Sequence, residues 1–222
     1  VNSLFEPTDG FSSNLSLEHL GGPLGGEVDA LRALWRNEWF VPMGADDEGH
    51  VRVFHPRISI AAAEPYDSSE ELPFFERWFA GGGSGPLPLR GFDFQGIGPR
   101  QEVRQTLLGP RLVKDRGEAV GGQLGASASL EAIYPLVTEY NPFRDQDEIL
   151  IKGVVFVDAG NLVANNHIND LLRNVRWSAG AGVRMRIPAL GGVTLVVDYA
   201  VPFAEEPGDE TRSLNFELSR RF

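Results

Sequence analysis

The sequence predicts an all-β protein, an antiparallel transmembrane β-barrel of about eight strands. Three observations lead to this prediction. Segments in which polar and apolar residues alternate recur along the 222-residue chain. The longest of these segments exceeds the usual length of a soluble strand. Hydrophobic residues make up only 42% of the chain, as expected where one face of each strand is apolar, and no run of about 18 apolar residues predicts a transmembrane helix.

The clearest predicted strand is Val175–Ile187. Its odd-numbered residues are apolar: Val175, Trp177, Ala179, Ala181, Val183, Met185 and Ile187. Its even-numbered residues are polar or glycine: Arg176, Ser178, Gly180, Gly182, Arg184 and Arg186. This segment is long enough to cross a bilayer, for which a tilted strand needs roughly 9–11 residues. We expect the apolar face to contact lipid and the polar face to line the barrel lumen.

Three further segments alternate clearly, and four alternate more weakly. The clear ones are Leu124–Tyr134, Val193–Val201 and Thr211–Phe222. The weaker ones are Phe11–His19, Val28–Phe40, Val51–Ala62 and Ile149–Asp158. In these strands we expect Leu195, Val197, Phe216 and Leu218 to face lipid, and Ser127 and Asn215 to face the lumen. The two faces of a strand are assigned together, because a slip of one residue inverts every side chain.

The connections between the predicted strands alternate in length, as in outer-membrane barrels. Short turns are expected at Pro42–Gly44, Pro135–Pro142, Pro188–Gly192 and Pro202–Gly208. Long connections are expected at Ala63–Gly121 and Gly160–Asn174, the second with a helical turn over Asn169–Arg173. The alternative is a soluble β-sandwich or lipocalin-like barrel, whose strands also alternate. Glycines and arginines on the polar faces favour a wet lumen, and therefore the membrane barrel.

Composition and motifs exclude several classes of function. The net charge of −11 argues against a nucleic-acid partner, since phosphate binding needs a basic surface. The chain has no cysteine, which rules out thiol chemistry and disulfides. Its four histidines lack metal-ligand spacing, and no nucleophile elbow or phosphate loop is present. We therefore expect no enzyme activity, no metal and no cofactor.

The most informative site is Arg90, which precedes Gly91 and Phe92 in the long connection. An arginine in a solvent-exposed loop is the common case. Glycine, however, allows the backbone to approach a wall closely, and a connection of roughly 60 residues is rarely structureless without a function. Glu131 and Asp158 are acids on strands beside apolar stretches. A loop arginine folded into the lumen would need such carboxylates to offset its burial.

The ordered motifs of this chain resemble the BamA superfamily of outer-membrane assembly factors and related transporters. Phe75–Gly83, Leu89–Phe92 and Ile97–Pro99 resemble the family's signature loop. Pro7–Gly10, Gly121–Gly122 with Ser129–Glu131, Phe156–Gly160, Ser178–Arg184 and Pro188–Gly191 resemble its later turns and strands, in the same order. The resemblance covers essentially the whole chain, and the set is specific although each piece alone is weak.

The resemblance implies a location in a bacterial outer membrane or the outer membrane of an organelle. It implies that Arg90 bonds to Glu131 and Asp158 inside the barrel. It also implies that the C-terminal strand, with Leu214, Phe216 and Leu218, forms a lateral gate, and that the terminal aromatic Phe222 is a targeting signal. The implied partners are unfolded outer-membrane proteins, outer-membrane lipid and accessory assembly proteins.

The family's barrels have sixteen strands and follow POTRA domains, so residues 1–222 correspond to the C-terminal half of one barrel domain. We interpret Val1 as a cut or incomplete N-terminus, and favour a fragment or an assembly partner over an autonomous small barrel. The two terminal strands are then not expected to pair within one chain. Other readings of function are a two-partner-type secretion pore, the barrel anchor of a passenger domain, and a passive structural barrel.

Overall fold

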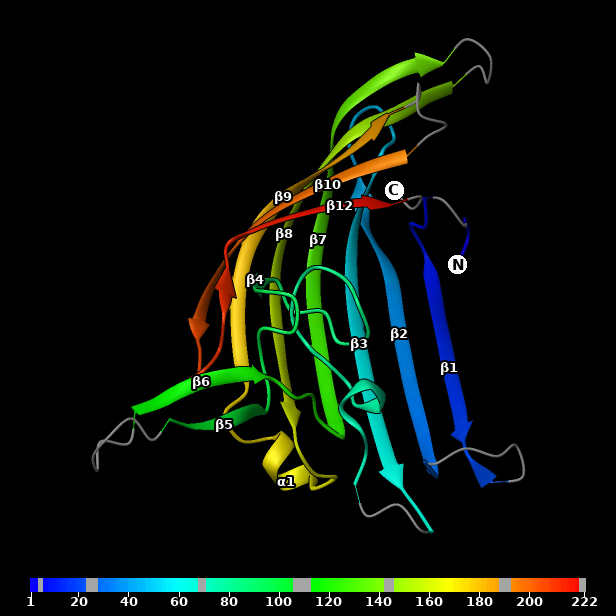
Figure 1. Cartoon of the computed structure of the whole chain (residues 1–222). Coiled ribbons are helices and arrows are strands. Elements are labelled where there is room, and N and C mark those ends of the chain that lie inside the picture. The colour runs from blue at the N-terminus through cyan, green and yellow to red at the C-terminus, as the bar shows by residue number, and fades with distance from the viewer. Residues whose placement is uncertain are drawn as a thin grey trace.

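The computed structural model describes residues 1–3, 6–22, 28–67, 71–105, 113–141, 146–187 and 193–219. Its main feature is an eight-stranded antiparallel sheet of order β1-β2-β3-β7-β8-β9-β10-β12 (Figure 1). The strands are β1 (Gly10–Leu20), β2 (Ala30–Ala45), β3 (Val51–Pro65), β7 (Leu124–Asn141), β8 (Gln146–Val163), β9 (Arg176–Ile187), β10 (Val193–Ala204) and β12 (Leu214–Ser219). The prediction of an all-β fold with about eight antiparallel strands is confirmed.

The sheet is an open, partial barrel whose edges are β1 and β12. Among the described residues no ladder joins β1 to β12, as expected for half of a larger barrel. Figure 1 shows the sheet curving around the long connection that carries β4. Residues of β1, β2, β3, β7 and β12 line an internal cavity of about 520 Å³ together with Gly83–Gly85 of that connection. The concave side of the sheet is therefore the lumen.

Several turn positions differ from those expected. The strand β2 continues through Pro42 to Ala45, and the turn falls at Asp46–His50, where the Asp46 amide donates to the His50 carbonyl at 3.0 Å. Register shifts at Pro42, Pro135 and Pro202 accommodate the prolines inside β2, β7 and β10. A β-bulge tolerates the missing N–H of proline, so proline does not end these strands as the sequence suggested. The expected turn over Pro188–Gly192 lies outside the described residues.

The long connection is more ordered than an irregular loop. It contains a 3-10 turn η2 (Phe74–Glu76), the short strand β4 (Gly91–Phe92), and a hairpin of β5 (Arg100–Gln105) and β6 (Val113–Ala119). This hairpin was not predicted, because its mostly polar residues lack an apolar alternation. The helical turn expected in the other long connection is present as α1 (Ile168–Leu171).

The predicted strand Thr211–Phe222 is wrong as a single element. The structure divides it into β11 (Thr211–Arg212), which pairs with β4, and β12, which pairs with β10. Thr211, Arg212 and Ser213 are all polar, and the alternation begins only at Leu214. Polar residues alone do not reveal that the chain changes its pairing partner at Ser213. Residues 220–222 lie outside the described part of the chain.

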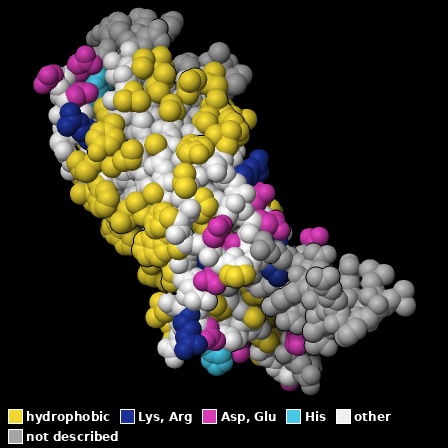
Figure 2. Space-filling view, turned by 90° about the vertical axis from the view of Figure 1, so that its left-hand side faces the viewer, with side chains coloured by type: hydrophobic (Ala, Val, Ile, Leu, Met, Phe, Trp, Pro, Cys, Tyr) yellow, Lys and Arg dark blue, Asp and Glu magenta, His cyan; other side chains and the backbone are white. Residues whose placement is uncertain are grey.

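The two faces of the sheet differ in polarity as the alternation predicts. Figure 2 shows apolar side chains gathered on the outer surface, with charged side chains mainly at the margins. Large apolar side chains exposed on β9, β10 and β12 are Trp177, Val183, Met185, Tyr199, Val201, Phe203, Leu214, Phe216 and Leu218. Ser127 on the opposite face is buried. In the described residues, no helix is long and apolar enough to cross a membrane.

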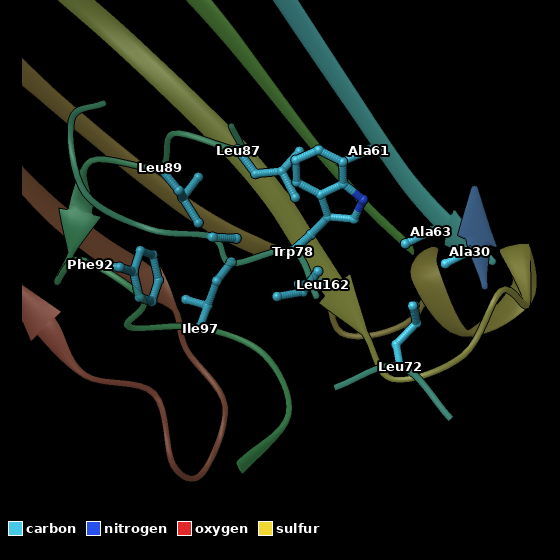
Figure 3. Close-up of a cluster of buried hydrophobic side chains, with 11 residues drawn as sticks. Ala30, Ala61, Ala63, Leu72, Trp78, Leu87, Leu89, Phe92, Ile97 and Leu162 are labelled. Carbon is cyan, nitrogen blue, oxygen red and sulfur yellow. The ribbon is translucent and has the colours of Figure 1, made fainter. Parts of the chain in front are cut away.

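A buried apolar cluster fixes the long connection against the wall (Figure 3). Trp78, Leu87, Leu89, Phe92 and Ile97 come from the connection and are at most 7% exposed. They pack with Leu162 of β8 and with wall alanines including Ala61 and Ala63 of β3. Small wall residues leave room for these large side chains, since protein interiors are close-packed. Arg90 directly follows Leu89 of this cluster, so the cluster determines where Arg90 meets the strands.

Candidate functional site: the buried loop arginine

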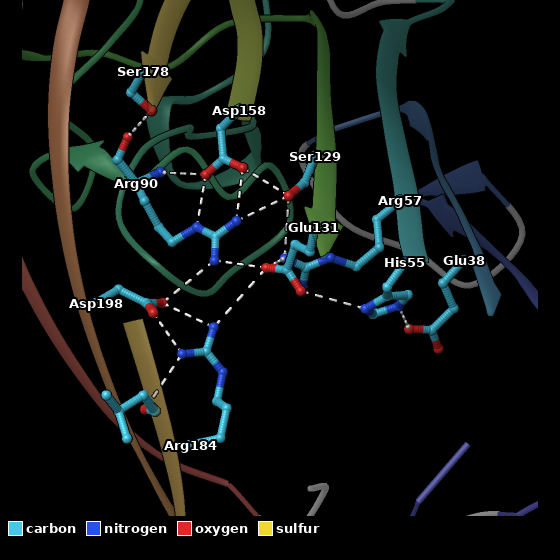
Figure 4. Close-up of polar contacts among 11 residues, drawn as sticks. Glu38, His55, Arg57, Arg90, Ser129, Glu131, Asp158, Ser178, Arg184 and Asp198 are labelled. Atoms are coloured by element: carbon cyan, nitrogen blue, oxygen red, sulfur yellow. Dashed lines mark hydrogen bonds and ion pairs between the residues drawn. The ribbon is translucent and has the colours of Figure 1, made fainter. Parts of the chain in front are cut away.

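Arg90 is the centre of a buried ionic cluster inside the barrel wall (Figure 4). Its side chain is 4% exposed. Its Nε and Nη2 each donate to Asp158 at 2.7 Å, in a two-pronged contact, and Nη1 lies 2.6 Å from Glu131 Oε1. Asp198 lies 3.4 Å from Nη1, and Nη2 donates to the Ser129 hydroxyl at 2.9 Å. The paired geometry matches the planar fork of a guanidinium, which lysine cannot reproduce.

The cluster is balanced in charge. Glu131, Asp158 and Asp198 face Arg90, and two further arginines approach from the wall. Arg57 lies 2.7 Å from Glu131, and Arg184 donates to Asp198. Three acids and three arginines therefore share the site, as burial of charge requires. Burial by itself would lower the pKa of Arg90, but the negative charges of Glu131, Asp158 and Asp198 outweigh it and raise that pKa above its ordinary value.

The backbone of the loop tip is fixed as firmly as the side chain. The Arg90 amide donates to Asp158 at 3.2 Å, and the Arg90 carbonyl accepts from the Ser178 hydroxyl. Gly91 has a φ of +89°, and a Cβ there would meet the Ser178 Cβ at 3.0 Å. Glycine is thus required at this position both by the left-handed backbone and by the close wall.

Two glycines of β9 make room for the groups that hold Arg90. A Cβ at Gly182 would collide with the Asp198 carboxylate, and one at Gly180 would collide with the Phe156 ring. The Phe156 ring lies 3.4 Å from the Arg90 guanidinium carbon, measured to the ring centroid. This is the geometry of a cation–π contact. The glycines of the polar face of β9 therefore serve the ionic cluster as well as the lumen.

The structure brings together Arg90, Gly91, Phe92, Glu131 and Asp158, all singled out from the sequence. Phe92 packs in the neighbouring apolar cluster and not against the charged side chains. Sequence reasoning missed further members of the site: Arg57, Ser129, Phe156, Ser178, Arg184 and Asp198. A signal for two of them existed, since Ser129 shares the polar parity of Glu131, and Asp198 breaks an apolar strand as a lone acid.

The other singled-out residues form a second region, at the C-terminal edge. Leu214, Phe216 and Leu218 of β12 are exposed on the outer, apolar face. Among described residues β12 has β10 as its only ladder partner in the main sheet. Phe222 lies outside the described residues, so its role as a terminal signal stays a prediction.

A curved antiparallel sheet with a lipid-facing exterior, a polar lumen and an arginine-bearing loop folded inside defines the class: an outer-membrane β-barrel protein. The chain belongs to the Omp85 superfamily, whose domain matches residues 1–222. The expected family and the expected outer-membrane location, bacterial or organellar, are thereby confirmed.

Relatives of known name support this assignment. The outer membrane protein assembly factor BamA of Neisseria meningitidis is 24% identical over 100% of this chain and 27% of its own length. The mouse homolog of sorting and assembly machinery component 50 is 26% identical over 86% of this chain and 37% of its own length. The human homolog of the same component is 30% identical over 60% of this chain and 26% of its own length. The chain thus spans well under half the length of these relatives.

A solved structure agrees in fold. BamA from Haemophilus ducreyi, lacking POTRA domains 1–3, superimposes with a TM-score of 0.73 at 23% identity. The match covers 98% of this chain and 40% of that chain. The eight strands are therefore equivalent to part of the BamA barrel.

Proposed function

We propose that this chain is the gate-bearing half of an outer-membrane protein assembly factor. It acts as a non-enzymatic insertase that folds β-barrel proteins into the membrane. The observation that carries the proposal is the edge of β12, which in the described part of the main sheet pairs with β10 alone, in a family whose named relatives are assembly factors. Unpaired backbone groups are costly in lipid, so an arriving strand gains hydrogen bonds by pairing there. This chemistry needs no nucleotide and no metal.

The register of β12 defines which residues offer that edge. Ala200 of β10 donates to the Ser213 carbonyl at 2.8 Å, and the pairing continues in register to Ser219. Successive residues of a strand point their backbone groups to opposite sides. Asn215 and Glu217 therefore bond toward β10, whereas Leu214, Phe216 and Leu218 present their N–H and C=O groups to the free side.

The Arg90 cluster supports the proposal as a fixed anchor. It joins the loop to β7, β8, β9 and β10, the strands beside the gate. A rigid wall next to a weakly held edge confines opening to β12. The proposed partners are unfolded outer-membrane proteins at β12, outer-membrane lipid at the apolar face, and accessory assembly proteins, the last implied by the family resemblance alone. The N-terminal half of the barrel would pair along β1.

A substitution on the free side of β12 tests the proposal. In the protein reconstituted in lipid vesicles, Phe216→Pro removes one edge N–H without removing a bond to β10. We expect it to slow the folding of a urea-denatured eight-stranded substrate barrel about ten-fold, followed by the mobility shift of folded barrels in gels. Phe216→Leu, which keeps the N–H and an apolar side chain, is the matched control and should leave the rate unchanged.

Equal substrate folding with both variants would contradict the insertase. A secretion pore, a passenger anchor or a passive barrel does not need a free N–H on β12. Each of these alternatives therefore predicts that Phe216→Pro and Phe216→Leu behave alike in the same vesicles.

A further inference from the structure

The C-terminal strand leaves the barrel wall partway along its length. Ladder pairing between β10 and β12 ends at Tyr199 and Leu214, with one further bond from the Ala200 amide to Ser213. The strand β10 itself continues to Ala204, paired on its other side with β9. Over the described residues Val201–Ala204, no ladder to the C-terminal strand is present. We call the C-terminal strand, residues 211–219, the gate strand. It is therefore held by β10 over only part of its length.

Pro202 explains why the ladder ends there. Alternate residues of β10 point toward the C-terminal strand, and Ala200 is one of them because it bonds Ser213. The next residue on that side is Pro202, which has no N–H to donate. If the C-terminal strand continued along β10 in register, Thr211 would stand opposite Pro202 and its carbonyl would lack a partner. The break is thus encoded in the sequence.

The loop that carries Arg90 supplies the missing partners. Thr211 and Arg212 pair with Phe92 and Gly91 as β11 and β4. The Asp93 amide donates to the Glu210 carbonyl at 2.9 Å, and the Glu210 amide donates to the Gly96 carbonyl at 2.8 Å.

Side chains reinforce this pairing. Arg100 Nη1 lies 2.7 Å from the Glu210 carboxylate, and Arg100 Nη2 donates to the Gly96 carbonyl at 3.0 Å. Arg212 lies 3.4 Å from Asp93. Since Arg90 is buried in the wall one residue before Gly91, the segment Glu210–Arg212 is tied to the ionic cluster through the loop.

We propose that β4 and β11, with the Arg100–Glu210 ion pair, form a clasp that holds the first part of the gate strand off β10. Opening the clasp would let Thr211 and Arg212 move toward β10 and lengthen the paired edge. The role of this movement in gating rests on the proposed function. The clasp itself is a statement about strand position, and its test is independent of any activity.

Two engineered cysteine pairs distinguish the arrangements, because the chain has no cysteine of its own. In a continued β10 register, Val201 and Arg212 would be a non-hydrogen-bonded pair with Cα atoms about 4.5 Å apart, close enough for a disulfide. Val201→Cys with Arg212→Cys therefore reports the open arrangement. Phe92→Cys with Thr211→Cys reports the closed one, in which these residues face each other.

The cross-links are measured in the protein in lipid vesicles under a mild oxidant. Pro202→Ala restores the missing donor, and Glu210→Ala removes the ion pair. We expect each to raise the open cross-link roughly two- to ten-fold and to lower the closed one, as for the change of one or two hydrogen bonds. Glu205→Ala, which removes an exposed acid from the same connection, is the matched control and should change neither.

An equal yield of the open cross-link in the parent, Pro202→Ala and Glu210→Ala backgrounds would overturn the clasp. Cross-links that shift as expected while Phe216→Pro leaves substrate folding unchanged would overturn only the insertase. The cysteine pair for the closed arrangement replaces the buried Phe92. Where that variant folds poorly, the yield of the Val201–Arg212 cross-link alone decides the test.

Discussion

At the residue scale, the position of the long connection depends on one arginine that forms ion pairs with three carboxylates. Arg90 contacts Asp158 through two nitrogens, and it also faces Glu131 and Asp198. Arg57 and Arg184 compensate two of these acids from the other side. Asp158 has no such second arginine among the contacts of the described residues, so its charge depends most on Arg90.

Replacing Arg90 should therefore be costly. We expect Arg90→Ala to lower the free energy of unfolding by about 3–5 kcal/mol, because buried carboxylates lose their partner. Arg90→Lys should recover only part of this loss, since a single ammonium cannot make the paired contact. Both losses are measured by urea titration, with the folded fraction followed as the gel band whose mobility changes on heating. Arg52→Ala, at an exposed arginine of β3, is the control, and equal midpoints for it and Arg90→Ala would contradict the anchor role.

At the element scale, β9 combines two requirements that its sequence satisfies on opposite faces. The outer residues Trp177, Val183 and Met185 are exposed and apolar. The inner residues Gly180 and Gly182 leave space for Phe156 and Asp198. A glycine inside a strand normally weakens it, so its presence here indicates a steric need.

Because of this steric need, we expect a glycine-to-alanine change here to lower stability, whereas strand propensity alone would predict a gain. Gly182→Ala would ordinarily stabilise a strand, but here the added Cβ displaces Asp198 from Arg90 and Arg184. We expect a loss of about 1–3 kcal/mol in the same urea titration, as for other overpacked sites. Ala181→Val, the neighbouring change on the outer face, should cost far less. A stabilised Gly182→Ala variant would show that the site tolerates the methyl group.

At the scale of the whole molecule, eight strands form a wall with two open edges. The central strands β7 and β8 pair on both sides, whereas β1 and β12 each pair on one side in the described structure. An open edge in a membrane needs a partner or a local opening to water. The apolar exterior, the polar lumen and the edges without a ladder partner among the described residues fit our proposal that the chain works within a larger barrel.

Amide hydrogen exchange resolved by residue should detect the edge of β12. We expect the amides of Phe216 and Leu218 to exchange about 100-fold faster than those of Asn215 and Glu217, which bond toward β10. Amides of Val155 and Val157 in β8, which are paired on both sides, serve as the protected reference. Uniform protection along β12 would mean that another strand covers the edge.

The sequence by itself determined most strands of the main sheet, their faces and the principal ionic contact, but not the hairpin of β5 and β6 or the division of Thr211–Phe222. Period two fixes which side chains of Val175–Ile187 face lipid, and this information is local. Arg90, Glu131 and Asp158 stood out because a charge beside glycines or apolar residues needs a partner. The tertiary structure alone decided the rest. Asp198 and Phe156 meet Arg90, and Arg184 meets Asp198, through packing of strands distant in sequence. The pairing of β11 with β4 is likewise tertiary, and in the clasp that we propose the missing N–H of Pro202 matters only once β10 and the returning strand lie side by side.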